Sequence, residues 1–396
     1  MKITHRYLLR ETLTYFLIAV LVFTIVFMMG KTLKLTELLV NKGVRILDIG
    51  KLLFYLLPSS LILMIPIALL LGVLITFVRL SSDNEIVALK ASGVSLYQLT
   101  PPVLFLSVMA YLLSTFLVIY VLPWGNEGFK HVLFDIAKTK AYTAFKERAF
   151  NDSFDGVVIY VDKITLRGKK LERIFIHSED DEVGVGGSKT ILAKEGYVGT
   201  NPDSQYIAFH LIGVTGDQIA KEDKSYTRIE SDTLVQKLAF GGNLYRVMRF
   251  RARDWETSIG ELRAKIKERK LQHKDYTQQL LEIYRKFSIP FACIVFGLMG
   301  IPLGVQPRRS GKSYGFILGI PVVLAYYMLR ILAETATYNG FIPPLIASWT
   351  PNLILMALAI YLLVKTANES PIAILRWLAQ IMESITLKIK KFPKTI

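Results

Sequence analysis

Six long runs of apolar, uncharged residues constrain the fold of this chain more than any other feature of its sequence. Each run approaches the ~20 residues that an α-helix needs to cross the hydrocarbon core of a bilayer. The mean hydropathy of +0.39 agrees with a protein that lies in a membrane. We therefore predict six transmembrane helices, within residues 12–30, 52–78, 99–122, 287–305, 314–329 and 341–364.

Basic residues fix the expected orientation of these helices. Six crossings place both termini on one side of the membrane, together with the connections at 79–98 and 306–313. Lysine and arginine gather in these parts, as the positive-inside rule requires of cytoplasmic segments. We predict cytoplasmic termini, with residues 31–53 as a short exterior loop and 124–256 as a large exterior segment. The first helix lacks a signal-peptide cleavage site, so it is expected to remain as an anchor.

The stretch SSDNEIVALKASG, at 81–93, separates the second and third apolar runs. Ser82 and Glu85 have the spacing of a capping box at a helix start, and Gly93 suits a helix end. The sequence thus predicts a short cytoplasmic helix whose apolar side is formed by Ile86, Leu89 and Val94. Two interpretations remain open. The helix is either a capped connector at the membrane surface or a module that docks into a groove of another protein.

Charged residues also lie at the exterior ends of the spans. Lys31 and Lys34, three residues apart after the first span, lie on a side where positive charge is normally avoided. They either anchor the helix by snorkelling or bind anionic head groups. Arg330 and Glu334 lie four residues apart beyond the fifth apolar run. They form either a structural ion pair or, through Arg330, a cation that completes an anion site with the two lysines.

The segment between residues 124 and 256 has a mixed composition with short β-rich runs separated by turn residues. It is long enough for a core of its own and contains no cysteine, so it needs no disulfide. The prediction is a β-sandwich or open barrel. We expect strands at 157–161, 173–177, 190–193, 205–213 and 233–240.

Residues 257–286 are densely charged and carry a narrow apolar stripe, which predicts a solvated helix that leads into the fourth span. Signals for catalysis are weak. The GKS at 311–313 lacks the first glycine of a nucleotide-binding loop, because Gln306 occupies that position. The five histidines fall in five different segments. We therefore expect no enzyme active site, no metal site and no cofactor.

Three segments carry a resemblance to a known family. They are RYLLRETL at 6–13, LSSDNEIVALKASGVS at 80–95 and IPLGVQPRRSGKSYGF at 301–316. With three spans on each side of a β-rich insertion, the chain resembles the lipopolysaccharide export permeases LptF and LptG. Within these segments, NEIVALKASG is the most specific motif. The RETL start and the PLGVQPRRSG loop are closer to the LptF half of that pair.

The resemblance implies a membrane α-helical protein with six transmembrane helices and an inserted all-β, jellyroll-like periplasmic domain. The implied function is that of the permease subunit of an ABC exporter in the inner membrane of a Gram-negative bacterium. Such an exporter extracts lipopolysaccharide and passes it to a periplasmic bridge for outer membrane biogenesis. The implied partners are a cytoplasmic ABC ATPase dimer, a second homologous permease, the bridge protein and the lipid, with no nucleic acid.

The same resemblance implies domain limits and roles for residues. Transmembrane helices would occupy 1–123 and 257–366, with the β-domain at 124–256 and a basic cytoplasmic tail at 367–396. Within the coupling helix at 81–93, the residues that meet the ATPase would be Glu85, Ile86, Leu89 and Gly93. The residues that meet lipid phosphates would be Lys31, Lys34 and Arg330.

Two rival functions belong to other classes. A membrane-anchored scaffold or sensor would use the spans only to hold the β-domain against an exterior partner, which leaves the short cytoplasmic helix unexplained. An ion-driven transporter would place carboxylates near mid-membrane. The six apolar runs contain no carboxylate, which argues against it.

Overall fold

The structure is a computed structural model, and its contacts divide the chain into two compact units. We call residues 1–30, 57–123 and 257–396 the helical unit, and residues 31–56 and 124–256 the sheet unit. The residues that the structure describes are 3–40, 45–144, 147–154, 157–165, 170–178, 187–200, 207–220, 226–238, 257–305 and 314–368.

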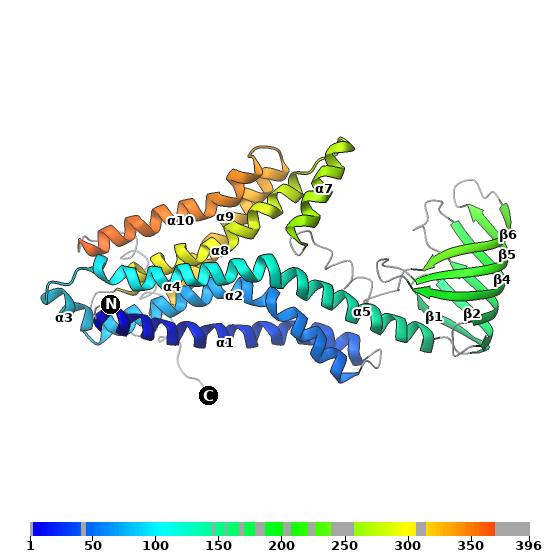
Figure 1. Ribbon diagram of the computed structural model, residues 1–396, viewed down its shortest axis with the longest axis horizontal. Helices are drawn as coiled ribbons and strands as arrows, with labels where there is room; N and C mark the ends of the chain where they lie inside the picture. The colour runs from blue at the N-terminus through cyan, green and yellow to red at the C-terminus, as the bar shows by residue number, and fades with distance from the viewer. Residues whose placement is uncertain are drawn as a thin grey trace, which may run out of the picture. The chain divides into compact units, whose positions relative to one another are not determined.

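The prediction of six transmembrane helices is confirmed for the described residues (Figure 1). All six are long and apolar enough to cross a membrane. The first two are α1 (Ile3–Val40) and α2 (Ile46–Ser82). The third begins at α4 (Leu96–Phe116) and continues through a π-helical turn, η1 (Leu117–Val121), into α5 (Leu122–Ala144). The last three are α8 (Thr277–Gly304), α9 (Tyr314–Tyr338) and α10 (Pro344–Ala367).

Several helices extend beyond the predicted limits. The prediction of a loop at 31–53 is wrong for most of that segment. Helix α1 continues to Val40 and α2 already begins at Ile46, so most of the connection is helical. Helical hydrogen bonds do not stop where the uncharged run stops, since lysine and threonine side chains also tolerate a helix. The π-helical turn η1 ends two residues before Pro123, which has no N–H for the usual bond to residue 119.

Helices α2 and α8 form the centre of the helical unit. In the most apolar 18-residue stretch of each of these helices, 72% is buried. The corresponding share is 6% for α1 and 17% for α9. Gly300 and Gly304 permit this packing, because a Cβ at these positions would lie 2.8 Å and 2.5 Å from side-chain atoms of Val73 and Phe77. Within the described part of the chain, the apolar faces of α1 and α9 remain largely uncovered. Lipid or a neighbouring subunit is what such faces require.

The prediction of a single solvated helix at 257–286 is wrong in part, because the segment contains two helices. Helix α7 (Ile259–Leu271) ends before His273, which has a left-handed φ of 51°, and α8 starts at Thr277. The charged residues of α7 are mostly exposed, as predicted. In contrast, Glu282 and Lys286 of α8 are 4% and 2% exposed. They are buried because α8 packs against α10 and α9 from its first turns.

The predicted β-rich insertion is confirmed as an antiparallel sheet. Its six described strands pair in chain order, so each is bonded to its sequence neighbours. They are β1 (Ala149–Phe154), β2 (Val157–Thr165), β3 (Lys170–Ser178), β4 (Gly187–Thr200), β5 (Ile207–Ala220) and β6 (Tyr226–Leu238). Strand β1 was not predicted, because AFNDSF lacks a β-rich run. Alternate apolar residues of β2 to β5, such as Ile159, Ile174 and Phe209, form the buried core of this unit.

Candidate functional site

The short helix between the second and third spans is α3 (Glu85–Ala91). The predicted capping box is wrong, because Ser82 is the last residue of α2 and the N-cap of α3 is Asn84, which makes no side-chain capping bond. Asn84 has a left-handed φ of 58°, a conformation that asparagine tolerates better than most residues. The chain therefore turns between α2 and α3 within two residues.

The predicted helix end at Gly93 is confirmed. Gly93 has a φ of 81°, which favours glycine. Its N–H donates to the carbonyl of Lys90 at 2.9 Å, and the N–H of Val94 donates to the carbonyl of Leu89 at 2.9 Å. These two bonds are those of a Schellman motif, which closes a helix and satisfies its last carbonyls.

Helix α3 is attached to the first turns of α1, and Figure 1 shows these two elements at the same end of the helical unit. The Tyr7 hydroxyl donates to Glu85 Oε1 at 3.3 Å. Nearby, Arg79 at the end of α2 pairs with Glu11 of α1 and with Asp83 at 3.5 Å. Helix α3 is thus held by polar contacts within its own chain.

The apolar side of α3 faces the protein itself. Ile86 is 3% exposed within the core formed with α2 and α4, and Leu89 packs against that core. The opposite side is exposed and presents Asp83, Asn84, Val87, Ala88 and Ser92. A partner that approaches α3 meets this second surface first, whereas Glu85 lies half-buried between the two.

The candidate lipid-phosphate residues are divided between the units. Lys31 lies half-buried on α1 in the sheet unit, and the side chain of Lys34 lies outside the described residues. Arg330 lies on α9 in the helical unit. Its Nε donates to Glu334 Oε1 at 2.7 Å, so the ion pair expected from their spacing is present.

Two further charged residues contact this ion pair, and the sequence did not predict them. Arg285 and Glu282 of α8 join Arg330 and Glu334 of α9, because Arg285 Nη2 lies 2.5 Å from Glu334 Oε2 and Arg285 also pairs with Glu282. We call these four residues the charge network. A charge pair between two helices leaves no periodic signal in the sequence, so only the fold reveals it.

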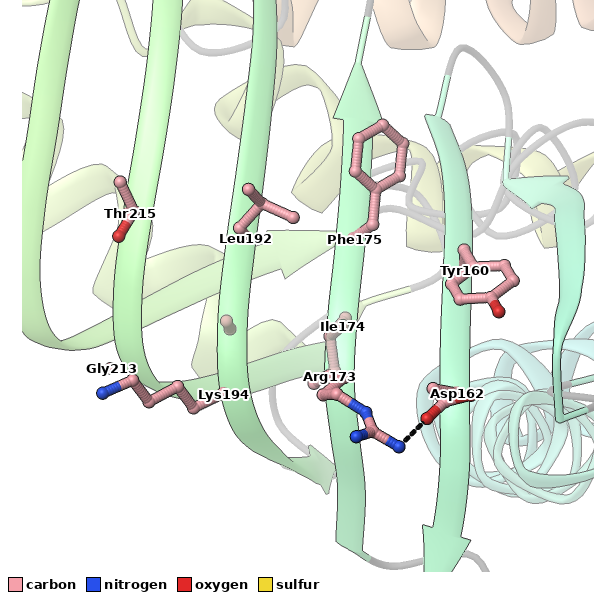
Figure 2. Close-up of a pocket in the computed structure, with 10 residues that line it drawn as sticks. Tyr160, Asp162, Arg173, Ile174, Phe175, Leu192, Lys194, Gly213 and Thr215 are labelled. Atoms are coloured by element: carbon pink, nitrogen blue, oxygen red, sulfur yellow. Dashed lines mark hydrogen bonds and ion pairs between the residues drawn. The ribbon is translucent and has the colours of Figure 1, made fainter.

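The sheet carries a groove of about 500 Å³ over β2 to β5, on the face opposite to its apolar core (Figure 2). Tyr160, Phe175 and Leu192 lie side by side on successive strands and form its apolar row. Two residues further along each strand, Asp162, Arg173 and Lys194 form a charged row. The groove therefore combines aromatic and aliphatic surface with charges of both signs.

Asp162 is the best-bonded charge in this groove. It pairs with Arg173, the contact drawn in Figure 2, and with Arg148 at 3.2 Å. The hydrogen bond from Arg173, supported by the charge of both arginines, lowers the pKa of Asp162 below its usual value. The groove had no sequence signal, since it depends on strand register.

Comparison with known proteins gives a consistent result. A family model described as "Lipopolysaccharide export system permease LptF/LptG" matches residues 6–365. The chain is 22% identical over 366 residues to lipopolysaccharide export system permease protein LptF of Escherichia coli strain K12, which covers 90% of this chain and 93% of that protein. It is also 25% identical over 195 residues, 48% of this chain and 54% of the relative, to the uncharacterized protein RP871 of Rickettsia prowazekii.

Proposed function

The chain belongs to the lipopolysaccharide export permease family LptF/LptG, and from that membership we propose that it is the LptF-like subunit of an ATP-driven lipid exporter. As a member of this family it is a multi-pass transport subunit of the inner membrane. In this proposal, both termini face the cytoplasm and the sheet unit carries the periplasmic domain, while lipopolysaccharide is extracted from the membrane.

Energy is required because the cargo is a lipid. Exposing acyl chains to water costs about 0.8 kcal/mol per CH₂ group, which no thermal fluctuation supplies for several whole chains. We assign ATP hydrolysis to a separate cytoplasmic ATPase dimer, and the second set of six spans to a homologous permease. The exposed apolar faces of α1 and α9 suit such a neighbour or the lipid itself.

The observation that carries the proposal is α3. It is a seven-residue helix with a closed C-terminal end, attached to α1 through Tyr7 and Glu85. A force applied to α3 is therefore transmitted to α1, which is the least buried span. We propose that the ATPase contacts Glu85 together with the exposed side of the helix. Ile86, Leu89 and Gly93 then keep the helix in place, since two of them pack inward and the third ends it.

At the periplasmic side, we propose that the sheet receives the acyl chains and passes the lipid to a bridge protein through strand addition at one edge. Of the described strands, β1 and β6 form the edges. Strand β1 is six residues long with a register shift between Asn151 and Phe154, whereas β6 has thirteen residues. Short and irregular edges resist pairing, so β6 is the better template.

The first experiment purifies the full-length chain from its native membrane in mild detergent and identifies the proteins that accompany it. With wild type, we expect a soluble ATPase and a second six-span chain. Glu85→Arg should reduce the recovered ATPase about tenfold, because a charged contact becomes repulsive. Tyr7→Phe removes the hydrogen bond within the chain but keeps the Glu85 charge, so the ATPase should be retained. Glu127→Arg, at an exposed site of α5, is the matched control.

The outcome separates the two functional classes. A chain that emerges alone, or only with exterior partners, in several detergents supports the membrane-anchored scaffold or sensor. An ATPase that remains bound to Glu85→Arg contradicts the role of that carboxylate while leaving the exporter intact.

A second experiment tests Lys31 and Lys34. The double variant Lys31→Glu with Lys34→Glu should bind lipopolysaccharide more weakly than wild type at low salt, and the difference should shrink at high salt because exposed charges are screened. Lys267→Glu, on the exposed face of α7, is the control. Equal binding of wild type and double variant at low salt would remove these lysines from the lipid site.

A further inference from the structure

Glu334 of α9 lies between two arginines that come from different helices. Its Oε1 accepts a hydrogen bond from Arg330 Nε at 2.7 Å, and its Oε2 lies 2.5 Å from Arg285 Nη2. Arg285 uses its other terminal nitrogen, Nη1, for Glu282. The four side chains are only 5% to 22% exposed. Each charge is largely removed from water and depends on its neighbours for stabilisation.

The charges of the network cancel, since two arginines face two glutamates. While Arg330 is paired with Glu334, its positive charge is neutralised and attracts an external anion only weakly. It becomes an anion ligand only when Glu334 turns away. A buried carboxylate that lost its sole partner would be strongly destabilised, but Glu334 already has a second partner in Arg285.

Arg285 also has an unused donor in a useful position. Its Nε is buried and has no hydrogen-bond partner in the described part of the chain. The Nε and Nη2 atoms lie on one edge of the planar guanidinium and form the fork that holds a carboxylate through both oxygens. Because Glu334 Oε2 is already at Nη2, a rotation of the carboxylate would bring Oε1 to Nε.

We infer that Arg285 is the positioning residue that releases Arg330 for an anionic head group. In one arrangement Glu334 bridges the two arginines, as observed. In the other, Arg285 holds both oxygens of Glu334 and the Arg330 guanidinium is free to bind a phosphate. The change is an exchange of hydrogen-bond partners with no covalent step. That the phosphate belongs to a transported lipid rests on the proposed function, whereas the exchange itself does not.

The inference makes two substitutions in one network act in opposite directions. Arg285→Met leaves Glu334 to Arg330 alone, so affinity for a phosphate-bearing lipid should fall about tenfold, in proportion to the smaller fraction of free Arg330. Glu334→Gln removes the competing carboxylate charge, so affinity should rise roughly fivefold. A merely structural network would weaken binding in both variants.

Arg285→Lys tests the fork itself and guards against misfolding of the methionine variant. Lysine keeps the positive charge but presents a single point of contact, so it cannot hold both oxygens of Glu334 in a plane. Affinity for the phosphate-bearing lipid should again fall, by roughly threefold. The variant should elute from a size-exclusion column as the wild type does, which shows that it is folded. Arg263→Lys, at an exposed position on α7, is the matched control.

The experiment uses the full-length chain in phosphatidylcholine nanodiscs and titrates it with lipopolysaccharide and, separately, with inorganic phosphate. Lipid titration measures the proposed substrate, and phosphate titration shows whether the head-group chemistry alone suffices. In parallel, phenylglyoxal modification of Arg330 is quantified by mass spectrometry without any ligand. We expect the reactivity of Arg330 to be highest in Glu334→Gln, intermediate in wild type and lowest in Arg285→Met.

The two readouts fail separately. If Arg330 reactivity follows the expected order but no variant binds lipopolysaccharide, the exchange is supported and lipid binding by this chain on its own is contradicted. If wild type binds the lipid but Glu334→Gln weakens binding as Arg285→Met does, the inference is overturned. Equal Arg330 reactivity in all three proteins overturns it as well.

Discussion

Among the residues that the structure describes, each unit of this protein contains a carboxylate placed between two arginines. In the sheet unit, Asp162 lies between Arg148 and Arg173, which are 77% and 72% exposed. In the helical unit, Glu334 lies between Arg285 and Arg330, which are 12% and 22% exposed. The carboxylates themselves are similarly covered, at 17% and 16%. The surroundings of the arginines are the main difference.

That difference decides what each cluster can do. Exposed arginines can exchange a carboxylate for water at little cost, so the Asp162 cluster adds little to stability. Arg285 and Arg330 are largely shielded from water, so loss of Glu334 leaves the charge of Arg330 without its carboxylate and leaves Arg285 with Glu282 alone. Burial thus turns an ordinary surface pair into a network whose members depend on one another.

The most direct way to break this comparison is to remove the shared carboxylate in each unit. We expect Glu334→Ala to lower the free energy of unfolding by about 3 kcal/mol, the usual cost of leaving buried charge unpaired. Asp162→Ala should leave the unfolding transition nearly unchanged. Thermal unfolding of the full-length chain in detergent measures both. Similar shifts for the two variants would show that burial of the arginines does not control the effect.

Packing at glycine gives a second comparison of the two units. An added Cβ at Gly72 of α2 would lie 2.8 Å from the backbone nitrogen of Phe16 in α1, and backbone cannot move aside. At Gly196 of β4 the nearest atom is the side-chain tip of Ile174, at 2.5 Å, which can rotate. We expect Gly72→Ala to destabilise the protein by about 2 kcal/mol and Gly196→Ala by less than about 1 kcal/mol. Equal losses in the same unfolding assay would contradict the distinction between backbone and side-chain neighbours.

The sequence was sufficient for the features that depend on local or bulk chemistry. Six apolar runs predicted six spans, because a bilayer demands long uncharged segments whatever their packing. Gly93 predicted a helix end, because helices often end at a residue with a left-handed backbone conformation, which glycine adopts most easily. The spacing of Arg330 and Glu334 predicted a pair, because residues four apart share one face of a helix.

Features that depend on contacts between distant segments were missed. The charges of α8 were expected to be solvated, yet Glu282 is 4% exposed because α9 and α10 cover it. The capping role of Ser82 failed because α2 extends through that residue, which a local spacing rule cannot detect. Strand β1 has little β propensity and is held by its pairing with β2.

The smallest expected effect concerns the acid stability of the exposed cluster. The hydrogen bond from Arg173 lowers the pKa of Asp162 in the folded sheet, while in the unfolded chain this pKa returns to about 3.9. A carboxylate with a depressed pKa stabilises the folded state at pH values above the unfolded pKa. That contribution is lost as the pH falls through the lower, folded value. The sheet should therefore loosen around β2 and β3 only below about pH 4, as the pH falls from the unfolded pKa towards the lower, folded pKa of Asp162.

Asp162→Asn removes this titration without changing the shape of the side chain. In the full-length protein, cleavage within 147–178 by an acid-active protease should rise in wild type as the pH is lowered from about 5 to 3. In Asp162→Asn, cleavage should already be slightly higher at the upper pH, since the paired charge is absent, and should rise less. The matched variant Asp232→Asn, at an exposed position of β6, should follow the wild type. If Asp162→Asn shows the full wild-type rise, another group controls the acid response, and the exposed arginines do not hold the Asp162 charge strongly enough to matter.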